Sequence, residues 1–210
     1  MALNWASPFF SYEDIMTKPT SMTELEAVNV LLTTIGEAPV NTLEGNQVTD
    51  VSIAKQVLNE VSREVQAQGW HFNTEQGVEL SPNISGDIAI PADTARIDAQ
   101  DFNTVIREDK LFNLTDRTFS FASKIKVDIV YYQDFSVLPQ QAKKYITTRA
   151  ARIFSDRLLN SESIHKMTSR DEQRALIDLK EFEGDTGDFN MMDSYSVARV
   201  MNRGFNRKVL

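Results

Sequence analysis

The chain has 210 residues, with 30 acidic and 22 basic side chains, a formal net charge of -8 and no cysteine. Hydrophobic residues make up 41% of it, which is enough to bury a core and excludes global disorder. The missing cysteine excludes disulfides, thiolate metal sites and cysteine nucleophiles, and the negative charge disfavours a protein that binds nucleic acid by neutralising phosphates. No apolar run approaches the length of a membrane helix, and the N-terminus lacks the pattern of a signal peptide. We therefore expect a cytoplasmic product without a membrane partner.

Residues 1–20 are predicted to form an N-terminal arm, because aromatic residues stand there without helical or strand periodicity and two prolines interrupt them. The aromatic residues are Trp5, Phe9, Phe10 and Tyr12. Two interpretations stay open: the segment folds onto its own core, or it packs on a neighbouring subunit.

Two helices are predicted between residues 21 and 69. Ser21 and Glu24 match a capping box, in which two side chains satisfy each other's backbone N–H groups, at the start of a helix over about residues 21–35. The second helix covers about residues 50–68, and a glycine follows each helix. The predicted apolar faces are Leu25, Val28, Leu32 and Ile35 in the first helix, and Val51, Ala54, Val57, Leu58, Val61 and Val65 in the second.

From residue 70 to residue 138 the period changes. Apolar and polar residues alternate in short runs separated by glycine and proline, which predicts four to six short antiparallel strands. The clearest strand is Lys124–Tyr132, with Ile125, Val127, Ile129 and Tyr131 on one face. We interpret this region as a β lobe inserted between helical segments.

Two further helices complete the predicted bundle. Pro139 opens a helix that runs to about Asn160, and a fourth helix runs from Ser163 to Glu183 with a break expected near Thr168-Ser169. We expect Gly184 and Gly187 to close it. The predicted fold is α+β: a bundle of about four helices (21–69 and 139–187), an inserted small antiparallel β lobe (70–138), and extended terminal segments (1–20 and 188–210).

The last segment reverses the charge of the chain. Acids crowd residues 171–188, whereas from Ser194 onward four basic residues stand without an acid, beside apolar residues. A basic and apolar end on an acidic protein is typical of a docking peptide. The alternative is a frayed terminus.

The sequence offers little for catalysis. The two histidines, His71 and His165, lie far apart and outside any metal-binding motif, and phosphate-binding loops and the GxSxG nucleophile pattern are absent. Acids between residues 185 and 193 lack the spacing of a calcium-binding EF-hand loop. Glu60 and Glu64 lie one helical turn apart, but their basic neighbours indicate a solvated charged face rather than a glycosidase pair. We therefore expect no catalytic residue, no metal and no cofactor.

Residues 23–80 resemble a known family. Residues 23–45 read TELEAVNVLLTTIGEAPVNTLEG, and residues 54–80 read AKQVLNEVSREVQAQGWHFNTEQGVEL. With a further match over 134–154, this pattern is similar to the tail tubular protein A family of short-tailed, podovirus-type bacteriophages over most of residues 20–195.

This resemblance implies a structural, non-enzymatic part of the virion tail, made in the host cytoplasm. It implies a homo-oligomeric ring of twelve copies between the portal protein and the tail nozzle, with duplex DNA passing through the channel without specific binding. The bundle carries the ring, the β lobe faces the nozzle (tubular B) protein and tail fibres, and the C-terminal segment inserts toward the portal.

On these grounds we predict three sets of assembly residues. The portal-binding set is Arg199, Arg203, Phe205, Arg207 and Leu210. The subunit-interface set is Trp5, Phe9, Phe10, Thr147 and Ala151. The nozzle- and fibre-facing set is Asp101, Asn103, Asp116 and Arg117. Two rival functions are a tail-associated glycan hydrolase that uses a carboxylate pair, and a monomeric module that decorates the tail.

Overall fold

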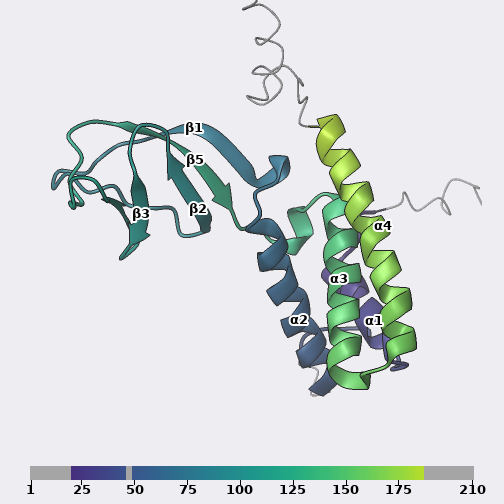
Figure 1. Cartoon of the computed structure of the whole chain (residues 1–210). Coiled ribbons are helices and arrows are strands. Elements are labelled where there is room, and N and C mark those ends of the chain that lie inside the picture. Colours follow the sequence, from purple (N-terminus) through teal and green to yellow (C-terminus); the bar gives the residue numbers. More distant parts are fainter. Residues whose placement is uncertain (1–19, 46–48, 187–210) are drawn as a thin grey trace, which may run out of the picture.

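The computed structural model describes residues 20–45 and 49–186 (Figure 1). The helices in these residues are α1 (Glu24–Thr34), α2 (Thr49–Gln66), α3 (Gln140–Leu159) and α4 (Glu162–Thr186). The strands are β1 (Thr74–Leu80), β2 (Thr94–Ala99), β3 (Thr104–Arg107), β4 (Lys110–Asn113) and β5 (Ile125–Tyr131). Two single-turn 3-10 helices, η2 (His71–Asn73) and η3 (Phe135–Val137), join the lobe to the bundle. This order of elements confirms the predicted α+β fold.

α3 lies at the centre of the bundle, and the other three helices pack against it. Its side chains Tyr145, Ile146, Ala150 and Phe154 are buried in one hydrophobic cluster with side chains of α1, α2 and α4. Burying an aliphatic or aromatic side chain of this size contributes about 1.5–3 kcal/mol. The predicted apolar face of α2 lies in the same cluster: Val51, Ala54, Val57, Leu58, Val61 and Val65.

α1 begins later than the sequence indicated. Its capping box consists of Thr23 and Glu26, because Glu26 N donates to Thr23 Oγ1 at 3.2 Å and Thr23 N donates to Glu26 Oε2 at 2.8 Å. Ser21 and Glu24 match the same motif two residues earlier. The predicted box was wrong because tertiary contacts occupy Ser21, whose Oγ accepts from Lys143 Nζ at 2.8 Å.

α4 is longer and more regular than predicted. The expected break near Thr168 and Ser169 was wrong, since the helix is continuous over Glu162–Thr186. The Thr168 hydroxyl donates to the Ile164 carbonyl oxygen at 3.0 Å, so it is satisfied inside the helix. Gly184 does not end the helix either, and at an exposed interior position it costs only about 1 kcal/mol relative to alanine.

The lobe is built around β5, the strand that the sequence shows most clearly. β5 lies between β1 and β2 in an antiparallel sheet, and β3 and β4 form a separate ribbon. Ile125, Val127 and Ile129 are buried in the lobe's own hydrophobic cluster, as their alternation predicted. Val130 points to the opposite face and is also buried, because the turn at Gly69 after α2 packs against it.

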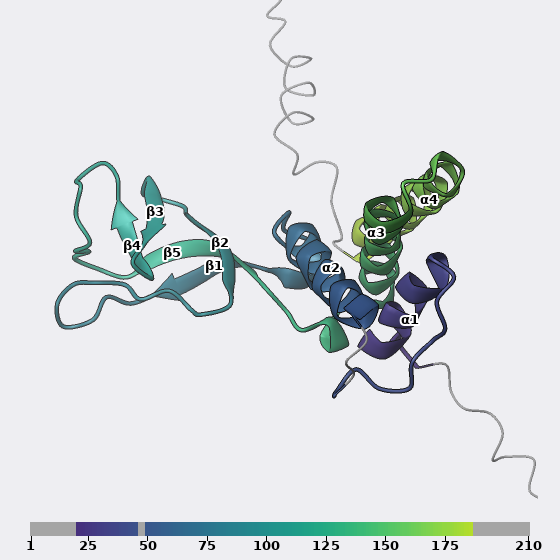
Figure 2. The same cartoon turned by 90° about the horizontal axis from the view of Figure 1, so that it is seen from below.

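Two different sides of the molecule result from this arrangement. The lobe extends from the bundle next to α2, whereas α1 and α4 lie beyond α3, away from the lobe (Figures 1 and 2). One side therefore presents α2 and the lobe, and the other presents α1, α3 and α4.

Candidate assembly surfaces

A buried polar network joins the lobe to the bundle. Gln66 at the end of α2 is 2% exposed; it donates from Nε2 to Gln133 O at 3.0 Å and accepts from Gln133 N at 2.7 Å. Asn73 Nδ2 donates to the carbonyl oxygens of Gln66 and Tyr131 at 2.9 and 2.8 Å. Each such group would cost about 1–3 kcal/mol if left buried and unpaired. The segments that enter and leave the lobe are therefore fixed to the end of α2.

A buried carboxylate connects α4 to the base of the lobe. Glu183 is 9% exposed, and its Oε2 accepts from the backbone N–H of His71 at 2.7 Å. The neighbouring Trp70 donates from Nε1 to Val65 O at 2.7 Å. His71 thus serves here through its backbone, at the first residue of η2. The orientation of the lobe depends on α4 as well as on α2.

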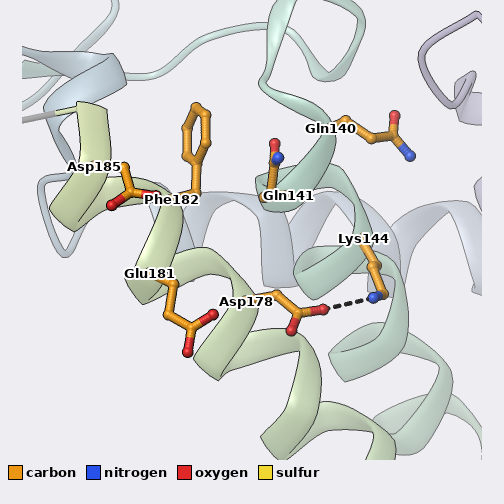
Figure 3. Close-up of a pocket in the computed structure, with 7 residues that line it drawn as sticks. All are labelled: Gln140, Gln141, Lys144, Asp178, Glu181, Phe182 and Asp185. Carbon is orange, nitrogen blue, oxygen red and sulfur yellow. Dashed lines mark hydrogen bonds and ion pairs between the residues drawn. The ribbon is translucent and has the colours of Figure 1, made fainter.

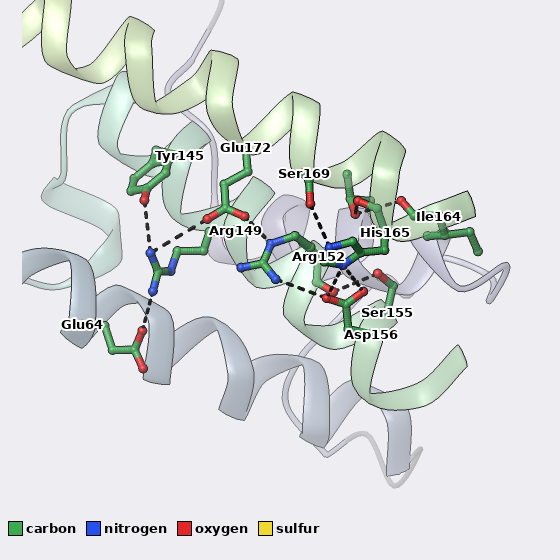
Figure 4. Close-up of polar contacts among 11 residues, drawn as sticks. Glu64, Tyr145, Arg149, Arg152, Ser155, Asp156, Ile164, His165, Ser169 and Glu172 are labelled. Carbon is green, nitrogen blue, oxygen red and sulfur yellow. Dashed lines mark hydrogen bonds and ion pairs between the residues drawn. The ribbon is translucent and has the colours of Figure 1, made fainter. Parts of the chain in front are cut away.

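Arginines of α3 bridge α2 and α4 (Figure 4). Arg149 Nη2 lies 3.0 Å from Glu64 Oε2, and Arg149 Nη1 lies 3.9 Å from Glu172 Oε1. Arg152 pairs with Glu172 through Nε and with Asp156 through Nη1, the latter at 3.2 Å. The hydrogen bond to Glu172 raises the pKa of Arg152 above its usual value. Paired charges therefore tie three helices together along one edge of the bundle.

His165 belongs to a cluster whose order of groups is that of a serine-hydrolase triad. Its Nδ1 lies 2.9 Å from Asp156 Oδ2, and its Nε2 lies 3.4 Å from Ser169 Oγ. Nucleophilic catalysis also requires donors that stabilise an oxyanion. Ser169 lies inside α4, where backbone N–H groups bind helical carbonyls, and the nearby Arg152 is held by carboxylates. The cluster therefore ties the end of α3 to the start of α4.

The carboxylate pair considered for glycan hydrolysis is engaged in ion pairs. Glu60 accepts from Arg157 Nη1 and Nη2 at 3.0 and 3.1 Å, and Glu64 accepts from Arg149 Nη2 at 3.0 Å. The hydrogen bond from Arg157 lowers the pKa of Glu60. A glycosidase acid needs the opposite shift, so that it stays protonated near neutral pH. These contacts make both carboxylates partners of α3 arginines.

Open hollows lie on the bundle surface. One of 450 Å³ is formed by the first turns of α3 and the last turns of α4, where Lys144 Nζ lies 2.7 Å from Asp178 Oδ2 (Figure 3). Another of 420 Å³ lies between α1, α3 and α4. Within residues 20–45 and 49–186 no cluster of His, Cys, Asp or Glu is arranged to hold a metal ion. None of the helices that the structure describes is long and apolar enough to cross a membrane.

Thr147 and Ala151 are the two predicted subunit-interface residues that fall in the described part of the chain. They are 2% and 5% exposed, respectively. Thr147 packs inside the subunit, where its Oγ1 donates to Met22 Sδ at 3.3 Å. Ala151 lines the 420 Å³ hollow. The remaining interface and portal residues lie outside the described residues: Trp5, Phe9, Phe10, Arg199, Arg203, Phe205, Arg207 and Leu210.

The four predicted nozzle- and fibre-facing residues are exposed on two loops of the lobe. Asp101 and Asn103 precede β3, and Asp116 and Arg117 follow β4. The backbone brings the loops together, because Leu114 N donates to Asn103 O at 2.8 Å. The two predicted loops thus lie next to each other.

Ile84, which the sequence interpretation missed, is a fully exposed apolar residue on the lobe. It lies between β1 and β2 with a relative exposure of 109%. The loop is held by Asn83, whose Oδ1 accepts from Ser85 N and Asp87 N at 2.9 Å each. An isoleucine flanked by proline, asparagine and glycine is the signal that identifies such a residue, since those neighbours favour a turn.

Known proteins resemble this chain in sequence. The sequence model of the tail tubular protein family matches residues 25–189, which include the bundle, its junction with the lobe, and the lobe. Tail tubular protein A of Klebsiella phage KP34 is 28% identical over 127 residues, which cover 60% of this chain and 67% of that protein. The chain belongs to the tail tubular protein family, whose members are structural proteins of phage tails.

Proposed function

We propose that this chain is one subunit of an adaptor ring of twelve copies that joins the portal of the phage head to the tail nozzle. Family membership supports a structural role in the tail. The two different sides of the molecule suit head-to-tail contacts, which form a closed ring when the rotation between neighbours closes.

The observation that carries this proposal is the fixed junction between bundle and lobe. Gln66 and Asn73 hold the lobe from α2, and Glu183 holds it from α4. In a ring of bundles, every lobe would then project in the same direction and the lobes together would form a platform. A flexible linker between the two parts would not give that regularity.

The lobe platform is the proposed contact with nozzle and fibre proteins. The adjacent loops that carry Asp101, Asn103, Asp116 and Arg117 are exposed, and they stand on a hydrogen-bonded scaffold. Loops on a rigid scaffold commonly carry recognition.

The segment 188–210 is the proposed contact with the portal. It continues from α4, the helix that Glu183 fixes to the lobe. We propose that Phe205 and Leu210 act as apolar anchors while Arg199, Arg203 and Arg207 pair with portal acids. Buried anchors with complementary charge give such contacts affinity and register.

The channel of the ring is proposed to pass duplex DNA without holding it. The chain carries a net charge of -8, and acids facing a channel repel phosphates. Assembled rings should therefore retain no duplex at physiological salt. Tight, salt-dependent duplex binding by rings would contradict this part of the proposal.

A bridging experiment tests the adaptor function. Portal rings are immobilised, this protein is added, and nozzle protein is added last, with each bound amount measured. The full chain should link the two partners. Deleting residues 196–210 should abolish portal binding, and the double variant Asp116→Lys with Arg117→Glu should weaken nozzle binding only.

Each arm of that experiment has its own contradictory outcome. A full chain that ignores the portal rules out the adaptor function. If the deletion variant binds the portal as tightly as the full chain does, only the proposed C-terminal contact is ruled out. Nozzle binding that is unchanged in the double variant rules out the loop assignment.

A further inference from the structure

A groove runs along the side of the bundle that faces away from the lobe. α1 and α4 both pack on α3, on the side away from the lobe (Figure 2). Thr148 and Ala151 of α3 line this 420 Å³ hollow between Val30 on the α1 side and Thr168 on the α4 side. Val30 is 41% exposed. Small side chains from α3 leave room for larger side chains from another segment.

The charged residues at this groove are paired with their own neighbours. Lys144 Nζ lies 2.7 Å from Asp178 Oδ2, and Arg174 Nη1 lies 3.9 Å from Asp171 Oδ1. The remaining lining residues are threonine, valine and alanine, and the threonine hydroxyls donate to carbonyl oxygens of their own helices. Because its charges already have partners, the groove favours an apolar occupant over the basic segment at the C-terminus.

The described chain begins beside the 450 Å³ hollow, which adjoins this groove. Ser21 Oγ and Met22 N donate to Gln140 Oε1 at 3.1 and 2.8 Å. Gln140 lines the 450 Å³ hollow, and that hollow shares Lys144 with the groove, so the two adjoin. The segment before Thr20 is rich in aromatic residues: Trp5, Phe9, Phe10 and Tyr12.

The length of this N-terminal segment also favours it as the occupant of the groove. The ten residue-to-residue steps from Phe10 to Thr20 span about 33 Å when extended. Two packed helices are about 20 Å wide, so the segment is long enough to pass from one bundle to the next. An aromatic side chain that leaves solvent buries roughly 150–250 Å².

We infer that the groove between α1 and α4 is the receiving half of a head-to-tail contact, filled by the aromatic N-terminal segment of the next copy. The inference rests on the proposed ring, and it names the partner of the side that faces away from the lobe. It also assigns Ala151 a place in the subunit interface, at the groove.

A photo-crosslinker in the N-terminal segment tests this inference on the full chain. One preparation carries Phe10→benzoylphenylalanine, and the other is the unsubstituted chain labelled with nitrogen-15. The two are mixed in equal amounts, assembled on portal rings, irradiated and digested, and the cross-linked peptides are identified by mass. The same substitution at Val137, which is exposed and outside the groove lining, is the matched control.

We expect the probe at Phe10 to cross-link to peptides containing Val30, Thr148 or Thr168, with heavy and light partners in equal yield. The Thr148→Trp variant fills the groove and should lower that yield about tenfold. Val137→Trp, at an exposed position outside α2 and outside the groove lining, should leave the yield unchanged. If Thr148→Trp disturbs folding, Val30→Arg serves in its place. Val30 lines the groove at an exposed position of α1, and this variant should also lower the yield.

The other outcomes overturn the inference in distinguishable ways. If only unlabelled peptides were cross-linked, the N-terminal segment would lie on its own subunit. Cross-links to peptides outside the groove would show that the segment binds another surface. Ring formation is followed in the same samples by light scattering. Rings without groove cross-links contradict the inference and leave the proposed function standing, whereas a failure to form rings contradicts both.

Discussion

Gln66 and Lys143 are among the polar side chains that lie deep inside this protein, and each is 2% exposed. Gln66 binds the backbone of Gln133, where the chain returns from the lobe. Lys143 Nζ donates to Ser21 Oγ at 2.8 Å and to Ser136 O at 2.7 Å. Each residue joins segments far apart in sequence, so individual side chains determine how lobe, bundle and chain start meet.

Replacing Gln66 should weaken the whole fold. Gln66→Ala leaves the N–H and carbonyl of Gln133 without their partner, which should lower the free energy of unfolding by about 1–3 kcal/mol. Urea denaturation of the purified protein measures the change. The exposed neighbour Gln68 is the control, and Gln68→Ala should stay within about 0.5 kcal/mol of wild type. Equal effects from the two variants would contradict the account of the junction.

The burial of Lys143 predicts how the stability of the protein depends on pH. Burial lowers the pKa of Lys143 below its ordinary value of 10.5. Between the lowered and the ordinary pKa, the unfolded chain binds more protons than the folded chain, so this group's contribution to stability rises with pH. Below that window, the cost of burying the charge is fully present.

The measurement compares wild type with Lys143→Met by urea denaturation across the alkaline range. The stability of wild type relative to the variant should increase as pH rises toward 10.5. Lys180→Met, at an exposed position of α4, is the control and should show no such trend. A wild-type advantage that is flat or falls with pH would overturn this interpretation of Lys143.

Neither buried polar residue was recognisable from the sequence. Gln66 lies in a helix whose apolar face was predicted correctly, but its partner Gln133 is 67 residues away. Lys143 lies between the buried residues Ala142 and Tyr145 of α3, although a lysine in a sequence normally indicates a solvated position. Local patterns report periodicity, whereas the partners of these groups depend on tertiary contacts.

At the scale of elements, α3 holds the bundle together by two means. Its apolar residues share a core with all three other helices, and its arginines pair with acids on α2 and α4. The first two helices were predicted because each carries a regular apolar face, and β5 was predicted because it alternates. The cap of α1 and the continuity of α4 were missed because Ser21 and Thr168 have hydrogen-bond partners that the motif alone does not reveal.

Breaking the α3–α4 pair should loosen α4. Glu172 has a side chain 15% exposed, and it faces both Arg149 and Arg152. Glu172→Gln should lower the free energy of unfolding by about 1–3 kcal/mol, since it removes one of the two carboxylates that pair with each part-buried arginine. Amide hydrogen exchange should also quicken in α4 before the rest of the bundle.

The control for Glu172 is an exposed pair on the same helix. Glu162 lies 2.7 Å from Lys166 with a side chain 83% exposed, and Glu162→Gln should change stability by less than about 0.5 kcal/mol. If the two glutamate variants were equally stable, the ion pairs of Glu172 would contribute no more to the stability of α4 than an exposed ion pair does.

At the scale of the whole molecule, the orientation of the lobe and the groove opposite it define the two sides. Neither was predictable from periodicity, because both arise from contacts between segments that lie far apart in the chain. Among the predicted assembly residues, the lobe loops proved exposed and adjacent, whereas Thr147 proved buried in the bundle. Small residues on a helix are equally compatible with close packing inside a subunit and with packing between subunits.

The exposed isoleucine of the lobe gives a test that leaves the fold intact. Ile84 contacts solvent, so Ile84→Asp should change stability by less than about 0.5 kcal/mol. If the lobe forms the nozzle platform, the same variant should weaken nozzle binding, because it puts a charge where an apolar anchor would be buried. Val137→Asp, also exposed but outside the lobe strands, is the control and should bind the nozzle normally. Unchanged nozzle binding by Ile84→Asp would remove Ile84 from the contact.

The most direct test of the central claim is the mass of the full chain by light scattering, measured alone and after mixing with portal rings, with imaging of any large species. The account predicts a closed ring near twelve copies of the 23.8 kDa chain in at least the portal sample. A strict monomer that ignores the portal would contradict the adaptor function and would instead favour a module that only decorates the tail.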